Sequence, residues 1–220
     1  SKFQKEEIFF PTQLFYCSVC FFFQLSCIVN KEIIFPKSYP YTSSSTKILR
    51  NNFEKLSHKC FSEFLITKKD LIIDIGSNDG NLLSNFKGKM RILGVTPENI
   101  GKLAIKKGIP TILDYFDNSS VAKILKKFGK AKFITATNVF AHIDHPHKLV
   151  KNILKCLKIN GIFIAEVHYV SSLIKTLQYD TVYHEHMRYY SLFSLQKLLG
   201  MHGLRIFDAE IIKTHGGSLR

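Results

Sequence analysis

The sequence has no run of apolar residues long enough to cross a membrane. Its most apolar window, residues 15–29, is shorter than the roughly 20 residues of a membrane helix and is interrupted by Ser18, Gln24 and Ser26. We expect this window to form buried or partly buried strand, and we expect no membrane partner. The first residues carry charges of both signs, unlike a secretory signal peptide, so a cytoplasmic location is predicted.

Cysteine and acidic residues are also scarce. The five cysteines are odd in number and lack the spacing of a disulfide framework, which indicates reduced thiols. Only 17 Asp and Glu residues oppose 31 Lys and Arg residues, so the formal net charge is +14. A basic protein favours phosphorylated partners such as RNA, membranes or nucleotide-linked substrates. Lysines spread over solvated faces would explain the charge equally well.

A further absence is the dinucleotide-binding pattern Gly-x-Gly-x-x-Gly. The stretch 71–83 predicts a buried parallel strand, a tight turn and the first turn of a helix, with Asn78 and Asp79 suited to the helix start. Asparagine occupies positions 78 and 81, where the pattern needs glycine, which argues against a dinucleotide pressed onto bare backbone. The spacing of Asp74, Gly76 and Gly80 instead resembles the first motif of class I methyltransferases, which use S-adenosylmethionine (SAM).

Strand and helix patterns alternate after residue 45. The expected strands are 71–75, 91–95, 110–113, 131–137, 162–167 and 205–212. The expected helices are 46–61, 80–86, 98–107, 118–128, 146–157 and 192–202, and Gly161 is expected just after the end of the fifth. This alternation predicts an α/β fold with a parallel sheet covered on both faces. Residues 1–45 are expected to form a partial N-terminal module and linker, and residues 46–220 a SAM-dependent methyltransferase domain.

Open α/β sheets bind ligands at the carboxyl ends of their strands, and polar or aromatic residues follow the predicted strands. Thr96 stands where a methyltransferase normally has an acid for the ribose hydroxyls, and Glu98 follows as a substitute. After the third strand, Asp114 is a candidate for the adenine amino group, with aromatic residues next to it to stack on the ring. Asn138, after the fourth strand, suits the methionine end. The full set of cofactor-binding candidates is Asp74, Gly76, Ser77, Asn78, Gly80, Thr96, Glu98, Asp114, Tyr115, Phe116 and Asn138.

The same position after the fourth strand also argues against one class of substrate. Methyltransferases of exocyclic base amines place Asn or Asp, two prolines and an aromatic residue there, whereas this chain has Asn138-Val-Phe-Ala. Methylation of RNA or DNA is therefore disfavoured, and no nucleic-acid partner is expected.

The run Tyr183-His-Glu-His186 concentrates polar side chains that are costly to bury. A histidine with a pKa near its ordinary value of about 6.5 suits the removal of a proton near neutral pH. Glu185 would orient an imidazole or raise its basicity. A metal site built on the His-x-His spacing has no third ligand except His142, His145 or His147, and a solvated loop explains the last two better.

Five motifs together resemble one family, the SAM-dependent C-methyltransferases of deoxysugar biosynthesis. These enzymes act on nucleoside-diphosphate 4-keto-6-deoxyhexoses. The motifs are Tyr39-Pro-Tyr-Thr-Ser-Ser, Asp74-Ile-Gly-Ser-Asn-Asp-Gly, Asn138-Val-Phe-Ala-His, Tyr183-His-Glu-His and Thr214-His-Gly-Gly-Ser-Leu-Arg220. The resemblance implies a Rossmann-like SAM domain between an N-terminal zinc module of two Cys-x-x-Cys pairs and a further C-terminal α/β domain. Because the first pair and the C-terminal domain have no counterpart here, we expect the chain to be a fragment.

The resemblance also assigns roles. It implies that Cys17 and Cys20 correspond to the second pair of zinc ligands. Two cysteines cannot close a structural zinc site, which needs four ligands, Phe21 replaces the glycine usual after the pair, and two ordinary thiols explain the cysteines equally well. His186 matches the family's general base. Tyr183, Glu185, His142 and Tyr41 match positions around the sugar, and Arg188 is a candidate anchor for the diphosphate.

The reaction that this resemblance implies starts at the carbon beside the C4 ketone. His186 would remove the acidified proton, Tyr183 or His142 would donate to the enolate oxygen, and the carbon would take the methyl group of SAM. Two alternatives remain open, namely a SAM methyltransferase of another small molecule and a non-catalytic degenerate fragment. The sequence does not indicate which sugar is used or how many copies of the chain associate.

Overall fold

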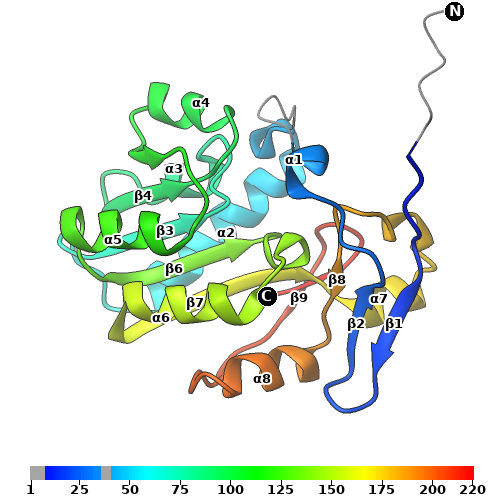
Figure 1. Ribbon diagram of the computed structural model, residues 1–220. Helices are drawn as coiled ribbons and strands as arrows, with labels where there is room; N and C mark the ends of the chain where they lie inside the picture. Colours follow the sequence, from blue (N-terminus) through cyan, green and yellow to red (C-terminus); the bar gives the residue numbers. More distant parts are fainter. Residues whose placement is uncertain (1–7, 36–40) are drawn as a thin grey trace, which may run out of the picture.

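A computed structural model describes residues 8–35 and 41–220 of the chain (Figure 1). The centre is a seven-stranded sheet in the order β5-β4-β3-β6-β7-β10-β9. Its strands are β3 (Leu71–Ile75), β4 (Arg91–Val95), β5 (Thr111–Ile112), β6 (Ala131–Thr137), β7 (Leu157–His168), β9 (Ile211–Ile212) and β10 (Ser218–Leu219). The strands from β5 to β7 pair in parallel, as predicted, but β10 pairs antiparallel with β7 and with β9. The α/β fold is therefore confirmed, and the expected all-parallel sheet is corrected to a mixed one.

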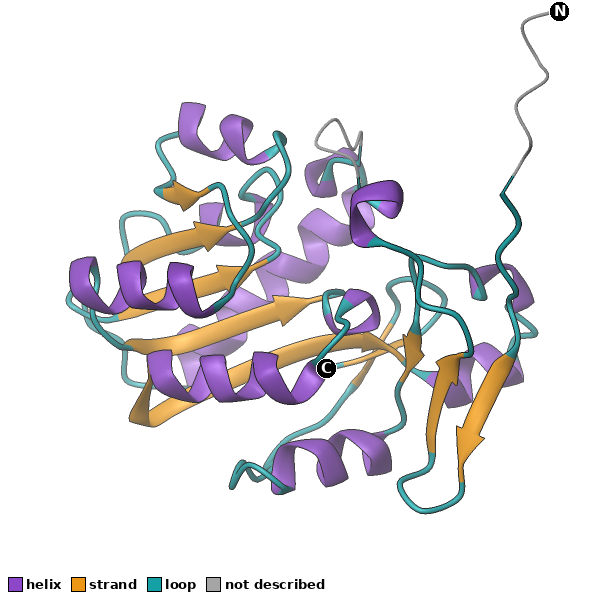
Figure 2. Ribbon diagram, viewed as in Figure 1, coloured by secondary structure: helices purple, strands orange, loops and turns teal. Residues whose placement is uncertain are grey.

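Helices cover both faces of this sheet (Figure 2). One face carries α5 (Asn118–Lys127), α6 (Pro146–Cys156) and α8 (Leu192–Gly200), and the other carries α2 (Lys47–Glu63), α3 (Asn81–Ser84) and α4 (Gly101–Lys106). Strand β3 shows why the two cores form. Leu71, Ile73 and Ile75 belong to the first core and Ile72 to the second, because successive side chains of a strand point to opposite faces.

The helices begin where the sequence offers caps. Thr46 accepts a hydrogen bond from the backbone N–H of Leu49 at the start of α2. At α5, Asp117 and Ser120 form a reciprocal capping box, with both bonds 3.0 Å long. Gly161 does not follow a helix end as expected. It lies inside β7, whose pairing with β6 shifts register around residues 158–161, so the chain passes from α6 directly into a bulged strand.

The N-terminal window forms strand, as expected, but only β2 (Phe22–Leu25) is partly buried. It forms a hairpin of β1 (Leu14–Cys17) and β2 (Phe22–Leu25), and β2 pairs with β8 (Arg188–Tyr189) in a separate three-stranded sheet. Strand β1 is exposed along its whole length, because it is the edge of this sheet. The pairing of β2 with β8 attaches the hairpin to the segment after the Tyr183–His186 motif.

Five more helical elements of the described residues connect these parts. They are α1 (Lys31–Ile34), α7 (Val170–Lys175) and three short 3-10 turns at Ser43–Ser45, Phe140–His142 and Tyr179–Thr181. The predicted strand 205–212 is reduced to Ile211–Ile212, since its partner β10 is itself two residues long. Tyr39 and Pro40 of the first quoted motif lie outside the described residues. No helix in residues 8–35 and 41–220 is long and apolar enough to span a membrane.

Candidate active site

A cavity of about 480 Å³ lies at the carboxyl ends of β3, β4 and β6. Every candidate catalytic residue lines it, and so does every candidate cofactor-binding residue except Gly80. These are Tyr41, Asp74, Gly76, Ser77, Asn78, Thr96, Glu98, Asp114, Tyr115, Phe116, Asn138, His142, Tyr183, Glu185 and His186. The structure thus brings together residues up to 145 positions apart in the sequence, because parallel strands end at one edge of the sheet. Lys31, His168 and His215 also line the cavity.

The turn after β3 is shaped by glycine. Gly76 has a φ of 72°, and a Cβ added there would lie 2.6 Å from Cγ2 of Val139, so no other residue fits without displacing its neighbour. Ser77 Oγ and Asn138 Oδ1 are buried at this turn without a hydrogen-bond partner among the described residues. Such unpaired polar atoms fit a ligand that carries polar groups, as SAM does. Gly80 has a different reason to be glycine, because a Cβ there would lie 2.5 Å from Ile109.

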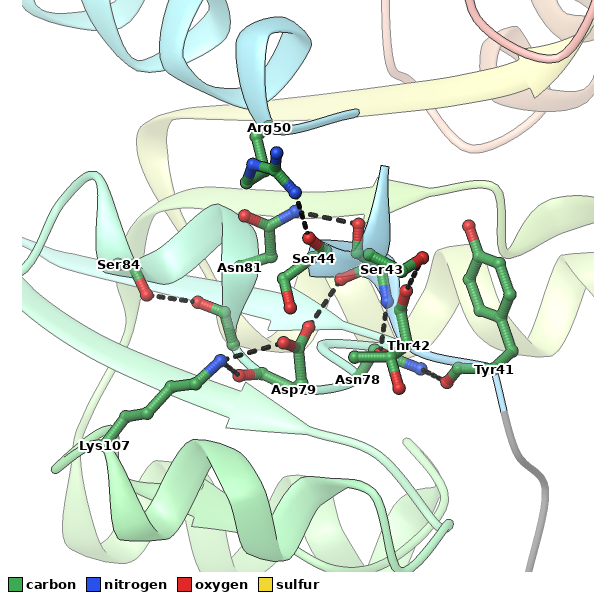
Figure 3. A network of polar contacts seen from close by, with 12 residues as sticks. Tyr41, Thr42, Ser43, Ser44, Arg50, Asn78, Asp79, Asn81, Ser84 and Lys107 are labelled. Carbon is green, nitrogen blue, oxygen red and sulfur yellow. Dashed lines mark hydrogen bonds and ion pairs between the residues drawn. The ribbon is translucent and has the colours of Figure 1, made fainter. Parts of the chain in front are cut away.

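Asn78 and Asp79 do not cap the following helix as expected. Instead, their side chains hold the segment 41–44 against the turn (Figure 3). Asn78 accepts from the backbone N–H of Ser43 at 2.9 Å and donates to the carbonyl oxygen of Tyr41 at 3.0 Å. Asp79 accepts from the hydroxyl of Ser43 at 2.7 Å and from Lys107 at 2.8 Å. We call this set of contacts the latch. It fixes Tyr41 at the wall of the cavity.

The candidate cofactor-binding residues that follow β4 and β5 are held by contacts with their neighbours. The hydroxyl of Thr96 donates to the carboxylate of Glu98, so the acid two residues later is held at the end of β4. The carboxylate of Asp114 accepts from the backbone N–H of Tyr115 at 2.9 Å. The ring of Tyr115 lies under the ammonium group of Lys31, which is 3.8 Å from the ring centre. Aromatic and carboxylate groups therefore stand together at this end of the cavity.

Asp74 is buried at the end of β3 and accepts a hydrogen bond of 2.6 Å from Thr135. Burial raises its pKa to about 7, the negative charge of Glu166 adds to the rise, and the bond from Thr135 opposes it. Asp74 is thus placed to hold a proton near neutral pH. Its position on the strand was predicted, whereas this proton affinity depends on neighbours that the local sequence does not reveal.

Glu166 anchors the end of the described chain beneath the cavity. It is fully buried in β7. Its carboxylate contacts Nε and Nη2 of Arg220 at 2.8 and 2.7 Å and accepts a hydrogen bond of 3.0 Å from the side-chain amide of Asn52. Arg220 also pairs with Glu210 at 2.7 Å. These bonds hold the segment 214–220 so that His215 reaches the cavity. Sequence reasoning missed Glu166, although a lone acid inside the apolar strand 162–167 is the available signal.

Four imidazoles and one phenol form the opposite wall. The ring of His186 lies 5.3 Å from that of His142, 4.4 Å from that of His168 and 4.5 Å from that of Tyr183, measured between centres. His168 lies 5.2 Å from His215 in turn. Burial, together with the neighbouring imidazoles, lowers the pKa of His186 to about 4, and burial also lowers the pKa of His142. Both rings are therefore neutral at pH 7. We call these residues the histidine wall.

Hydrogen bonds to carbonyl groups assign the protons on two of these rings. His186 Nδ1 lies 3.1 Å from the carbonyl oxygen of Thr181, and His142 Nδ1 lies 2.6 Å from that of Glu185. A carbonyl oxygen only accepts, so each Nδ1 carries the proton. Each Nε2 is then a bare acceptor. His186 can thus accept a proton at Nε2, which lies 3.5 Å from the hydroxyl of Tyr183. Its pKa of about 4 makes it a weaker base than the histidine of ordinary pKa that the sequence suggested. Neutral His142, by contrast, cannot donate from Nε2. It therefore does not fit its expected role as a hydrogen-bond donor to the enolate oxygen.

Two other residues considered in the sequence analysis, Arg188 and His147, do not line the cavity. Arg188 is buried and donates to the carbonyl oxygens of Ile143 and Asp144, so it holds the backbone and is not available as the diphosphate anchor. His147 contacts His202, with Nδ1 and Nε2 2.9 Å apart. His145 lines the cavity, although a solvated loop had been the better explanation for it.

Cys17 and Cys20 lie in the turn of the β1–β2 hairpin. Backbone N–H groups of Cys20 and Val19 lower the pKa of Cys17, and Phe21 adopts a φ of 56°, which glycine would take more easily. Among the described residues, no group of three or more His, Cys, Asp or Glu side chains is placed to hold a metal ion. The two thiols supply half of the four ligands of a structural zinc, so the residues present do not fit a complete site.

Comparison with known proteins agrees with this geometry. Residues 48–209 match the family described as methyltransferase domain. The C-methyltransferase NovU of Streptomyces niveus is 32% identical over 215 residues, which are 97% of this chain and 51% of NovU. The chain therefore spans about half the length of this curated relative.

Solved structures with the same fold include three methyltransferases. A SAM-dependent methyltransferase from Archaeoglobus fulgidus has a TM-score of 0.58 and 16% identity, covering 83% of this chain and 77% of its own. A possible histamine N-methyltransferase from Thermotoga maritima has 0.57 and 17%, covering 79% and 84%. Magnesium protoporphyrin IX methyltransferase from Synechocystis, solved with SAH, has 0.56 and 12%, covering 78% and 83%. At these identities the likeness shows the fold, which is that of class I methyltransferases.

Proposed function

The chain belongs to the SAM-dependent methyltransferases, and we propose that it methylates a carbon atom next to the ketone of a nucleoside-diphosphate 4-keto-6-deoxy sugar. The similarity to a C-methyltransferase supports transfer to carbon. The motifs at residues 183–186 and 214–220, which resemble those of the sugar C-methyltransferases, support the keto-sugar acceptor. The basic charge of the chain favours a substrate that carries a diphosphate.

The observation that carries this proposal is the state of His186. Transfer to carbon requires a base that removes a C–H proton, whereas many acceptors with oxygen or nitrogen nucleophiles need only orientation. His186 is neutral, its Nδ1–H is held by the carbonyl oxygen of Thr181, and its Nε2 is an acceptor that faces the hydroxyl of Tyr183 at 3.5 Å, in the same cavity as the Gly76 turn. A positioned imidazole of this kind contributes roughly 10²–10⁴-fold to proton transfer.

Different residues of the chain would bind SAM, remove the proton and position the sugar. The Gly76 turn, Glu98, Asp114 and Asn138 would hold SAM, which when bound supplies an electrophilic methyl group. His186 Nε2 would take the proton from the carbon beside the ketone, and the electrons of that C–H bond would move toward the carbonyl oxygen. Tyr41, from the other side of the cavity, would position the sugar. Holding the acceptor carbon close to the methyl group lowers the barrier by supplying the geometry in advance.

Exchange of the acidified proton with solvent tests this proposal without depending on the full turnover. The wild-type chain is incubated in D₂O with a 4-keto-6-deoxy sugar nucleotide and with either SAM or S-adenosylhomocysteine, the compound that SAM becomes after methyl transfer. Deuterium uptake into the sugar is followed by mass spectrometry. His186→Asn should abolish exchange and methyl transfer while SAM affinity in calorimetry stays within about twofold. His184→Asn is the matched control, because His184 contacts the carbonyl oxygen of Pro11 outside the cavity.

Two results would contradict the proposal. Exchange that persists in His186→Asn would remove this residue as the base. Tight SAM binding by a wild-type chain that neither exchanges nor methylates keto sugars would favour a different small-molecule acceptor.

A further inference from the structure

His168 is part of the histidine wall but has no role in the reaction described so far. It is the last residue of β7, where its backbone pairs with Ser218 of β10, and it is 7% exposed. Its ring makes a T-shaped contact with the ring of His186, with 4.4 Å between the centres and an angle of 87° between the planes. It lines the same cavity, beside the ring that we propose as the base.

The proton of His168 lies on the opposite nitrogen from that of His186. Its Nδ1 is buried and has no hydrogen-bond partner in the described part of the chain. A bare nitrogen without a partner costs less to bury than an N–H without a partner, so the proton resides on Nε2. Because Nδ1 is enclosed while the ring lines the cavity, the nitrogen that faces the cavity is Nε2 with its hydrogen.

We propose that His168 is a further catalytic residue, whose Nε2–H donates a hydrogen bond to the carbonyl oxygen of the acceptor. This inference rests on the proposed function. As His186 removes the proton, the electron pair of the broken C–H bond moves to that oxygen, which becomes an enolate oxygen. The charge therefore develops beside the ring that packs on the base. One preorganised donor at such an oxygen is worth roughly 10²–10³-fold in rate.

Two other members of the wall, His142 and Tyr183, are less suited to this role. His142 donates from Nδ1 to the carbonyl oxygen of Glu185, so its Nε2 is an acceptor. The hydroxyl of Tyr183 lies near Nε2 of His186 and is directed to the base. Burial, followed by the neighbouring imidazoles, lowers the pKa of His168 to about 3, so its ring stays a neutral donor throughout the neutral range. Neutral imidazoles serve as such electrophiles in enzymes.

Three variants of the full chain test the proposal. His168→Phe keeps a planar ring but has no donor, and His168→Gln restores an N–H donor. His202→Phe is the control, since His202 pairs with His147 outside the cavity. The measurements are the rate of deuterium exchange into the keto sugar, kcat and KM for methyl transfer, SAM affinity and thermal stability.

His168→Phe should lower exchange and kcat by about 100-fold and leave SAM affinity within twofold. His168→Gln should recover a tenfold part of that loss. The melting temperature of His168→Phe without ligand should rise by about 2–4 °C, because an unpaired buried nitrogen is removed. A residue that only supported the fold would lose stability and activity together.

Exchange within threefold of wild type in His168→Phe would overturn the inference while leaving the proposed function intact. The same holds if His168→Gln is as slow as His168→Phe. If the wild-type chain binds SAM but exchanges no proton with any keto sugar, the proposed function itself is wrong and the role of His168 is refuted with it.

Discussion

Replacing Asp79 by Asn removes the charge at the centre of the latch while keeping its shape. Asp79 is buried and accepts from Ser43 at 2.7 Å and from Lys107 at 2.8 Å. Burial alone would raise the pKa of Asp79, but the bonds from Lys107, Ser44 and Ser43 outweigh it and lower the pKa below its ordinary value. In the Asn variant the amide carries no charge, so the ion pair with Lys107 is lost.

The magnitude follows from the exposure of the partners. A hydrogen bond to a charged group is worth roughly 1.5–3 kcal/mol, and the half-exposed Lys107, at 45%, recovers part of its hydration, so we expect a loss of about 2 kcal/mol in the free energy of unfolding. For a chain of this size that lowers the melting temperature by about 4–8 °C. The loop Ser77–Gly80 should also loosen, so SAM binding should weaken several-fold.

Thermal unfolding and SAM calorimetry measure both effects. The control is Asp208→Asn, because Asp208 bonds to Lys59 at a similar distance of 2.7 Å but is half exposed, and exposed ion pairs contribute little. The contribution of Asp79 should be complete above the ordinary pKa of an aspartate, about 3.9, and disappear only as the pH falls through its lowered pKa. A melting temperature equal to that of Asp208→Asn between pH 5 and 8 would refute the reasoning.

Two further outcomes follow from the same geometry. Gly76→Ala should abolish SAM binding in calorimetry, because its Cβ would lie 2.6 Å from Val139. The control is Gly129→Ala, which has a similar φ but no described atom within 4 Å of the added Cβ. It should lose only about 1–2 kcal/mol of stability and bind SAM normally. Stability in denaturant should fall as the pH drops from about 6.5 toward 4, because His186 and His168 have lowered pKa values and the unfolded chain takes up their protons first. The slope should be smaller in the variant that combines His186→Asn with His168→Phe, and an unchanged slope would show that other groups cause the fall.

The parts of the site that the sequence predicted are those whose signal is local. Residues 71–73 are apolar on both faces and lead through Asp74 into the Gly76 turn, so strand, turn and helix could be placed from a dozen residues. The polar residues that follow each strand converge because of the parallel order of β3, β4 and β6, which the alternation of elements also predicts.

The features that escaped prediction depend on partners far away in the sequence. Strand β10 is two residues long and exists because it pairs with the end of β7, some 50 residues earlier. Strand β1 is exposed and β2 is only partly buried, because the hairpin pairs through β2 with the short β8. Strands β8 and β10 are each two residues long, which is too short for a periodic pattern, so no local signal indicates which neighbouring strand each one joins.

Asn78 shows how a correct local rule can lead to a wrong role. Asparagine before a helix usually caps it, and nothing in residues 74–84 suggests otherwise. Its φ of 50°, however, turns the amide away from the helix and toward the backbone of Tyr41 and Ser43, some 35 residues earlier. The same two side-chain atoms cannot cap a helix and hold that segment. Since the segment carries Tyr41, which we propose positions the acceptor, and the turn is proposed to hold SAM, the latch would make the geometry of one site depend on the other.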